Sequence, residues 1–308
     1  MQQEGKKAYE VIIWGSSIEY DKYAKSFSYE VAKGNMKIKA ITLNEEGIMS
    51  HLDGISLIKI EEILSYEFDY LIDMNQEDHQ TVLRILELLQ ISLDKVIPAR
   101  VFLHPAFDLQ RWVQVKESRV SLISNNCWGG YTYHSMGLKF DSPFINMFLR
   151  EENYLKLLEN FEHYMQCPIL LVEQCYEANL KRNYPVMGLE DVRLHFNHYT
   201  DAESAAVTWN KRKSRLNYDN LLVEMLIKTP EALERFLKLP FRHKIGFTML
   251  KCEEKDVISF GDYAYYMEKY ADADWRLINS MADWKANECK VYDVLKLLNH
   301  EEDYRRMW

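Results

Sequence analysis

Residues 11–35 read VIIWG followed by a segment with helical spacing, and this stretch decides the fold class. The apolar run Val11-Ile12-Ile13-Trp14 ends at Gly15, and Tyr20–Lys33 predicts a helix that stops at Gly34-Asn35. The alternation continues with strands at Ile38–Leu43, Phe68–Ile72 and Val96-Ile97 and a helix at Glu77–Gln90. Strands that alternate with helices predict an α/β fold with a parallel sheet.

A domain boundary is expected near residue 110. The alternating pattern lapses between Phe102 and Trp112, so we expect a Rossmann-like module over residues 1–110 and a larger α/β domain over residues 111–308. In the second domain the expected strands are Val120–Ile123, Ile145–Leu149, a buried-type strand at Ile169–Val172, Val192–Phe196, Leu221–Ile227 and Lys244–Phe247. The expected helices are Glu151–Met165, one from a Thr200-Asp201-Ala202-Glu203 capping box through Arg215, one from Thr229-Pro230-Glu231 to Leu239, and Val291–Asn299.

Composition narrows the class of protein. The 308 residues are 47% hydrophobic and 28% charged, which is typical of a globular protein, and 38 basic against 47 acidic residues give a net charge of −9. That balance argues against a nucleic-acid binder. Five scattered cysteines without a Cys-x-x-Cys pair, and no apolar stretch of membrane-span length, predict a cytoplasmic protein with no membrane span. A small-molecule sugar substrate and a homodimer are the expected partners.

The strand–glycine–helix at Gly15 lacks most of a dinucleotide-binding fingerprint. Ser17 and Tyr20 occupy the positions where that fingerprint has its second and third glycines. We therefore expect no tight NAD binding and no bound cofactor. This region resembles small Rossmann-like modules found beside sugar-modifying enzymes of bacterial surface polysaccharide pathways; the matching residues are Ile12-Ile13-Trp14-Gly15, Lys37–Leu43 with Asn44, and Ile60–Leu64 leading into Phe68–Ile72.

The most unusual peptide of the second domain is Ser124-Asn125-Asn126-Cys127-Trp128-Gly129-Gly130. Paired glycines let backbone amides approach a ligand, and Cys127 is a candidate nucleophile with those amides as oxyanion donors. A nucleophilic Cys127 should have a depressed pKa. The alternative is a tight loop in which Cys127 is a small buried residue and Trp128 anchors the core. Asn125, Asn126, Trp128, Gly129 and Gly130 are candidate substrate-binding residues.

A second candidate element is Asp191–Tyr199. On a strand, Asp191 and His195 share a polar face opposite Val192, Leu194 and Phe196, and both are candidate catalytic residues. They lie about 13 Å apart along a strand, too far for a hydrogen-bonded dyad. His198, a candidate substrate-binding residue, points to the face opposite His195, so we predict no metal site. A solvated face with one satisfied histidine competes equally with a site.

A third element is the cationic segment from Trp209 to Asn220. Arg212 and Arg215 lie three residues apart and could hold one phosphate or carboxylate, an anion site that we expect to face the Asn125–Gly130 loop. Cations that complement a helix dipole are the alternative. Asn217, Asp219 and Asn220 complete the candidate binding residues.

Several of these motifs together resemble a bacterial family of unknown function whose members are often labelled exopolysaccharide biosynthesis proteins. The motifs are Asn125–Gly130, Leu138–Pro143, His195-Phe196-x-His198-Tyr199, Trp209-x-x-Arg212-x-x-Arg215-x-Asn217-x-Asp219-Asn220 and Leu239-Pro240-Phe241-x-x-Lys244 with Phe247-Thr248. The resemblance covers Phe102–Thr248 and implies a role in surface polysaccharide assembly without naming a reaction.

Three functions follow. The first is a group transferase acting on a sugar, with a nucleotide sugar as candidate substrate, because amides bond hydroxyls and rings such as Trp128 and Tyr131 cover the apolar face of a sugar. The second is an acyltransferase or hydrolase that uses Cys127 with His195 or His198 as base. The third is a non-catalytic protein that binds a sugar or nucleotide.

Overall fold

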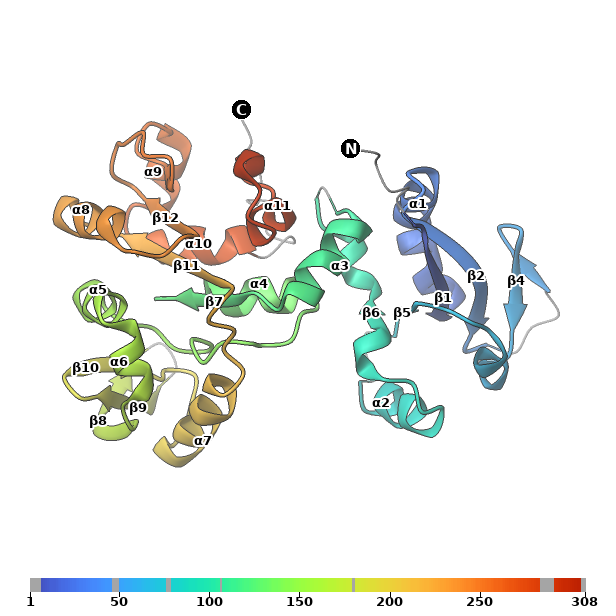
Figure 1. Cartoon of the computed structure of the whole chain (residues 1–308), viewed down its shortest axis with the longest axis horizontal. Helices are drawn as coiled ribbons and strands as arrows, with labels where there is room; N and C mark the ends of the chain where they lie inside the picture. The colour runs from blue at the N-terminus through green and yellow to red at the C-terminus, as the bar shows by residue number, and fades with distance from the viewer. Residues whose placement is uncertain are drawn as a thin grey trace. The chain divides into compact units, whose positions relative to one another are not determined.

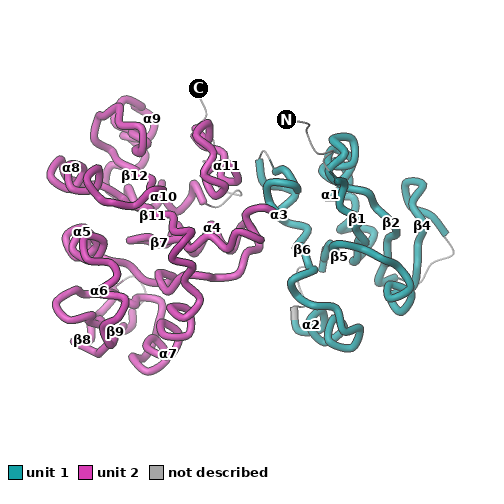
Figure 2. Tube along the Cα trace, in the orientation of Figure 1, with its two compact units in different colours: residues 1–113 teal, residues 114–308 magenta. Residues whose placement is uncertain are grey.

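The chain forms two compact units, residues 1–113 and residues 114–308 (Figures 1 and 2). The computed structural model describes residues 7–45, 50–75, 79–105, 107–178, 181–282 and 291–305. Both units are mixed α/β, and parallel pairing dominates their sheets. The fold class predicted from the sequence is confirmed to that extent.

Unit 1 contains a six-stranded sheet. Its elements are β1 (Tyr9–Gly15), α1 (Ser17–Ala32), β2 (Met36–Leu43), β3 (His51–Leu52), β4 (Ile55–Ile58), β5 (Tyr70–Asp73), α2 (His79–Leu88) and β6 (Val96–Pro98), with 3₁₀ turns at Ile60–Ser65, Leu93–Lys95 and Ala99–Leu103. The strand order is β3-β4-β2-β1-β5-β6, and only the β3–β4 pair is antiparallel among the described strands of this sheet. Within central β1, the apolar run Val11–Trp14 is buried, as expected for a strand whose two faces are both covered.

The strand–glycine–helix junction of unit 1 is closed by protein groups. The backbone N–H of Ser17, at the start of α1, donates to a carboxylate oxygen of Glu45 at 3.2 Å. A Cβ on Gly15 would lie 2.6 Å from Cβ of Met74, so the chain passes closely here. A carboxylate at this helix N-terminus competes with a phosphate. The expectation of no tight NAD binding stays a prediction, and Glu45 gives it a further reason.

Unit 2 contains two sheets. Helix α3 (Leu109–Ser118) crosses the boundary between the units. The elements that follow are β7 (Ser121–Ser124), α4 (Trp128–Ser135), α5 (Glu151–Glu159), α6 (Phe161–Gln166), β8 (Leu170–Glu177), β9 (Arg182–Leu189), β10 (Val192–His195), α7 (Ala202–Lys213), β11 (Leu221–Ile227), α8 (Pro230–Lys238), β12 (Lys244–Thr248), β13 (Val257–Ser259), α9 (Ala264–Tyr270), α10 (Asp274–Ala282) and α11 (Val294–Leu298). One sheet is parallel, in the order β13-β12-β11-β7, and the other is antiparallel, in the order β10-β9-β8.

The parallel sheet is covered on both faces. Ile123, Val223 and Met225 point into a core shared with residues of α5, α6 and α8. The alternate residues of β7 and β11 point to the face on which α4 packs, since a Cβ on Gly129 of α4 would lie 3.3 Å from Cβ of Ser124. The side chains of Ser124 and Glu224 are therefore enclosed between the sheet and α4.

Several local predictions need correction. Ile145–Leu149 is not a strand; Phe148 makes only an isolated bridge with His195. The helix expected over Glu151–Met165 is two helices, because the backbone at Asn160 leaves helical geometry. Helix α7 begins after the N-cap Asp201, whose carboxylate accepts from the Ser204 amide at 2.7 Å, and it ends at Lys213, so Arg215 lies beyond the helix.

The strand expected to be buried at Ile169–Val172 lies at an edge. β8 pairs only with β9 among the described strands, and Leu170, Leu171 and Val172 are 63%, 50% and 44% exposed. An apolar run of four residues has the same pattern in a covered strand and in an edge strand, so the sequence did not separate the two.

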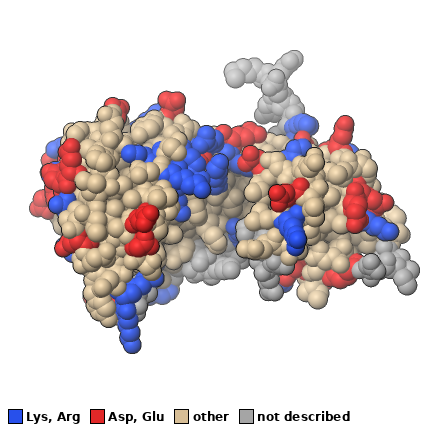
Figure 3. Space-filling model, turned by 90° about the horizontal axis from the view of Figure 1, so that it is seen from below, with Lys and Arg blue, Asp and Glu red and all other residues tan. Residues whose placement is uncertain are grey.

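Two features relate to the predictions from composition: the apolar length of the helices and the distribution of surface charge. No helix within the described parts of the chain has both the length and the apolar character needed to cross a bilayer. On the face shown in Figure 3, several basic side chains gather in one patch and acidic side chains are scattered over the rest.

Candidate functional site

The candidate site lies where β7 ends and α4 begins. Residues 125–127 connect the two elements at the carboxyl edge of the parallel sheet, which is the edge where open parallel sheets commonly bind ligands. Two sets of groups meet there: a buried polar network beneath the loop, and a thiol–imidazole pair nearer the surface.

The network centres on Glu224 of β11, whose side chain is fully buried. Ser124 Oγ donates to one carboxylate oxygen, and Asn126 Nδ2 donates to the other at 3.0 Å. Sequence reasoning missed Glu224. A signal was present, because Glu224 is the single charged residue in the otherwise apolar strand Leu221–Ile227, and a buried carboxyl needs partners of this kind.

The two asparagines lock the loop onto β11. Asn125 Oδ1 accepts from the Leu226 amide at 3.0 Å, and Asn126 Oδ1 accepts from the Trp128 amide at 2.8 Å. Asn126 Nδ2 also donates to Asn125 Oδ1 at 3.0 Å. Both side chains are buried, and these polar atoms form hydrogen bonds within the protein. They hold the loop in one conformation, which positions Cys127.

Burial controls the protonation of Glu224. Desolvation raises the pKa of its carboxyl to about 7, against the opposing effect of the hydrogen bonds from Ser124 and Asn126. The group therefore gains and loses a proton near neutral pH, which is unusual for a glutamate.

The paired glycines allow close packing. A Cβ on Gly130 would lie 3.4 Å from the Ile145 side chain, and the one on Gly129 would meet Ser124. The Gly129 amide donates to Ser124 Oγ at 3.3 Å, and the Trp128 amide is held by Asn126. Two amides of the first turn of α4 are thus used internally. Of the expected oxyanion donors, the Gly129 amide is therefore already bonded within the protein.

Trp128 and Tyr131, both on α4, have opposite environments. Trp128 is fully buried, its ring packs on Phe247, and its Nε1 donates to the Tyr292 hydroxyl at 2.9 Å. The core-anchor alternative therefore accounts for Trp128. Tyr131 is 44% exposed, one turn after Cys127. Tyr131 is the ring that a ligand at the surface can reach.

Cys127 and His198 form the thiol–imidazole pair. Cys127 Sγ lies 3.7 Å from His198 Nε2. Desolvation, followed by the charge of Glu224, raises the pKa of the Cys127 thiol to about 11. Desolvation, followed by the charge of Arg182, lowers the pKa of His198. The depressed thiol pKa expected of a resting nucleophile is wrong for Cys127: at neutral pH the pair is a thiol and a neutral imidazole.

His195 is joined to the loop through the segment before α5. Its backbone bonds that of Phe148 in both directions, at 2.9 and 3.0 Å, and the next residue, Leu149, donates its amide to Asn125 O at 3.0 Å. The His195 ring is buried, stacks on Phe148 with centroids 4.5 Å apart and contacts the Tyr184 hydroxyl. Its pKa is lowered mainly by desolvation. These contacts indicate that the buried His195 ring has a structural role in packing against the segment that holds the loop.

Asp191 lies at the other end of β10 from His195. Its carboxylate bonds Lys156 and accepts from the Tyr164 hydroxyl at 2.8 Å. Lys156, and after it Tyr164, lowers the pKa of Asp191. Its described partners come from α5 and α6, not from the loop.

The two arginines of the expected anion site are in different surroundings. Arg212 Nη1 donates to the Tyr199 hydroxyl at 3.1 Å, and to the carbonyl of Ile145, whose side chain borders Gly130. Arg212 is thus next to the loop. Arg215 lies two residues after the end of α7. Its backbone carbonyl accepts a hydrogen bond from the side chain of Arg119, two residues before β7.

Asn217, Asp219 and Asn220 lie at the amino edge of the parallel sheet, opposite the loop. Asn217 and Asn220 donate to the carbonyl of Ser118, each at 3.1 Å, and the Asp219 amide donates to Asn217 Oδ1. These bonds fasten the start of β11 to the start of β7 and explain the pattern as a structural turn.

Comparison with known proteins assigns the chain to a family. A family model described as "Domain of unknown function (DUF1919)" matches residues 99–299, which is more than half of the chain. The chain belongs to the DUF1919 family. Residues 7–97 match a second family model, described as "C2185-like, N-terminal". An "Uncharacterized protein" of Haemophilus influenzae is 33% identical over 147 residues, 46% of this chain and 68% of that protein.

The DUF1919 segment contains every element of the candidate site. β7, the loop, α4, β10 and β11 all fall within residues 99–299. Of the residues singled out from the sequence, the structure of this DUF1919 protein brings Asn125, Asn126, Cys127, His198 and Arg212 to one edge of the sheet. It places Asp191, Asn217, Asp219 and Asn220 elsewhere in unit 2.

Proposed function

We propose that this DUF1919 protein is a group transferase that acts on a sugar, with a nucleotide sugar as donor and His198 as general base. The observation that carries the proposal is the Cys127–His198 pair, at 3.7 Å. Its cysteine lies on the buried loop at the carboxyl edge of the parallel sheet. His198 itself is exposed, so an acceptor can reach it.

The protonation states of the pair support a base rather than a thiolate nucleophile. A lowered pKa keeps His198 neutral near pH 7, and a neutral imidazole has one nitrogen with a free electron pair. A raised pKa keeps Cys127 protonated, so that it orients the imidazole as a neutral partner. General bases work best when their pKa lies near or just below the working pH.

The proposed step transfers a glycosyl group. A hydroxyl of the acceptor gives its proton to His198 as its oxygen bonds the anomeric carbon of the donor sugar. The bond from that carbon to the nucleoside diphosphate breaks at the same time, and the diphosphate leaves as an anion. Tyr131 offers a ring face to the sugar, and Arg212, beside the loop, offers a cation to the phosphates.

The close approach of Cys127 to His198 favours a second candidate, an acyltransferase or hydrolase. There the thiol would attack an acyl carbonyl while His198 takes its proton, and a hydroxyl or water would release the acyl group. A thiol with a pKa of about 11 is a poor resting nucleophile, so we rank this candidate second. The third candidate is a non-catalytic protein that binds a sugar or nucleotide at the same surface.

We further propose a cellular context. The motifs that resemble exopolysaccharide biosynthesis proteins support a role in bacterial surface polysaccharide assembly in the cytoplasm. The order β2-β1-β5-β6, all parallel, supports a Rossmann-like assignment for unit 1. The exposed edge strand β8 supports a homodimer.

Melting temperature with a panel of UDP-, GDP- and CMP-sugars tests whether a nucleotide sugar binds. A ligand at 100 times its Kd adds about 2.7 kcal/mol, which corresponds to a rise of roughly 5 °C or more. Tyr131→Ala should remove most of that rise. Tyr176→Ala is the matched control, because Tyr176 is an exposed tyrosine on β8, away from α4. A panel without effect, or equal responses of the two variants, would contradict the proposal.

A further inference from the structure

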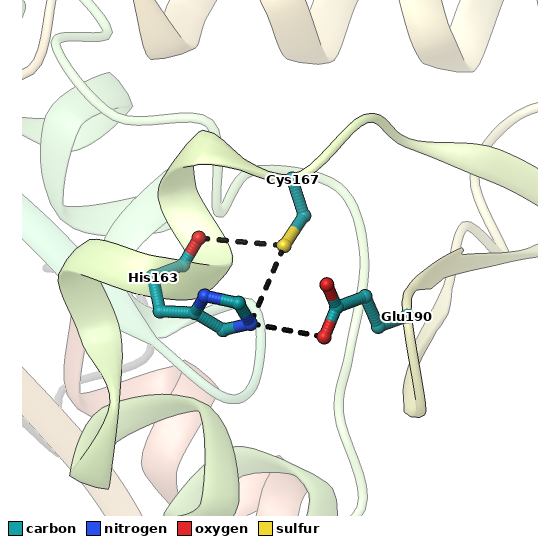
Figure 4. A group of neighbouring side chains, drawn as sticks. All are labelled: His163, Cys167 and Glu190. Atoms are coloured by element: carbon teal, nitrogen blue, oxygen red, sulfur yellow. Dashed lines mark hydrogen bonds and ion pairs between the residues drawn. The ribbon is translucent and has the colours of Figure 1, made fainter.

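Three side chains outside the candidate site converge on the surface of unit 2: His163, Cys167 and Glu190 (Figure 4). His163 lies on α6, and Cys167 caps the end of that helix. Residues four apart on a helix lie on the same face, which puts the imidazole beside the thiol. Glu190 is the first residue of the two-residue turn between β9 and β10, and its φ of 52° places it in the left-handed region.

The donor atoms face one another. His163 Nε2 lies 2.9 Å from Glu190 Oε2 and 3.8 Å from Cys167 Sγ, and all three donor atoms lie within 4.8 Å of one another. In Figure 4 the same imidazole nitrogen faces both the sulfur and the carboxylate. A tetrahedral zinc ion with bonds of about 2.0–2.3 Å holds such atoms about 3.3–3.6 Å apart. The two distances from His163 Nε2 lie within a few tenths of an ångström of that spacing.

We propose that His163, Cys167 and Glu190 bind one zinc ion and leave its fourth position to water. Imidazole nitrogen, thiolate sulfur and carboxylate oxygen are the ligand types that zinc takes in proteins. Three protein ligands with one open position form the arrangement of zinc sites that act on a bound molecule rather than closed structural sites. The thiol releases its proton to solvent when it binds the ion.

Among the described residues, His163, Cys167 and Glu190 form the group of neighbouring donors. The neighbouring carboxylate, Asp191, is bonded to Lys156 and to the Tyr164 hydroxyl. The side chains of His163 and Glu190 are 58% and 55% exposed, so an ion reaches the group from solvent, whereas Cys167 is buried beneath them. Against the prediction of no metal site, the sequence contains one signal for this group: a His-x-x-x-Cys spacing that begins in the predicted helix Glu151–Met165 and ends two residues beyond it. It gives no indication that Glu190 would join the pair.

Cobalt(II) is the probe that tests the site on the full chain. Titration of the metal-free protein should give a thiolate-to-cobalt charge-transfer absorption and the intense visible bands of tetrahedral cobalt, saturating at one ion per chain. Zinc should then abolish both signals by displacing cobalt. His163→Gln and Glu190→Gln should each weaken zinc binding more than about 100-fold, since outer-shell partners of zinc alone contribute about 10–100-fold.

Two features keep the test decisive. His163 and Glu190 are both exposed, so these variants are expected to stay folded, which circular dichroism verifies. Cys175→Ser is the matched control, because Cys175 is another free cysteine, on the neighbouring strand β8, and its loss should leave zinc affinity and the cobalt spectrum unchanged. Absence of the charge-transfer band, or zinc affinity in His163→Gln equal to that of the wild type, would overturn the proposal.

Discussion

His198→Gln is expected to slow glycosyl transfer by about 10²–10⁴-fold, the usual contribution of a general base. Glutamine keeps a polar side chain of similar reach but cannot accept the proton of the acceptor hydroxyl. Because His198 is exposed, the fold should be unaffected. The measurement is the rate of nucleoside diphosphate release from a nucleotide sugar that stabilises the wild type, with monosaccharide acceptors supplied.

Cys127→Ser separates the two enzymatic candidates. A serine hydroxyl replaces the thiol as a neutral partner of His198, so glycosyl transfer should stay within a few-fold of the wild type. The acyl-transfer candidate predicts the opposite, because an alcohol is not activated as a thiol would be. If Cys127→Ser abolishes turnover, and an acyl adduct on Cys127 is found by mass spectrometry, the glycosyl-transfer account is wrong.

Glu224 is expected to make stability depend on pH. Its pKa rises from an ordinary 4.5 to about 7 on folding, so between these values the folded chain binds more protons than the unfolded chain. The stabilisation is therefore complete below pH 4.5 and is lost as the pH rises through about 7. Each pKa unit corresponds to 1.36 kcal/mol, which gives about 3 kcal/mol in total.

Glu224→Gln isolates this contribution. Glutamine has nearly the same shape, can accept from Asn126 and can donate to Ser124 Oγ, but does not ionise. The histidines that titrate in the same range are common to both proteins and cancel. Urea unfolding should show the stability of the wild type relative to the variant falling by about 3 kcal/mol between pH 4.5 and about pH 8. A constant difference would show that Glu224 ionises as an ordinary carboxyl does.

Much of the fold followed from local sequence patterns. Leu221–Ile227 coincides with β11, and Thr229 is the N-cap of α8 with Pro230 in its first turn, as predicted. Val192, Leu194 and Phe196 are buried, as the alternation in that strand indicates. These features depend on residues close together in the chain, whose spacing and capping chemistry the sequence displays directly.

The site was less predictable because its contacts are long-range. The loop was singled out from Asn125–Gly130, but its buried partner, Glu224, is about a hundred positions later, and only the pairing of β7 with β11 brings them together. The pKa of Cys127 depends on that same burial. Cys289, one of the five cysteines, lies outside the described residues. The assignment of Trp128 to the core likewise required Tyr292, which comes from the C-terminal segment.

The most direct test of the central claim is to locate the bound sugar by NMR of the histidine side chains. The protein carries isotope-labelled histidine and is titrated with the nucleotide sugar that raises its melting temperature, and the His198→Gln spectrum assigns the His198 signals. We predict that the ring resonances of His198 shift saturably while those of His163, on α6, stay in place. Saturable binding that leaves His198 unmoved would contradict the claim that this DUF1919 protein binds its substrate at the Cys127–His198 pair.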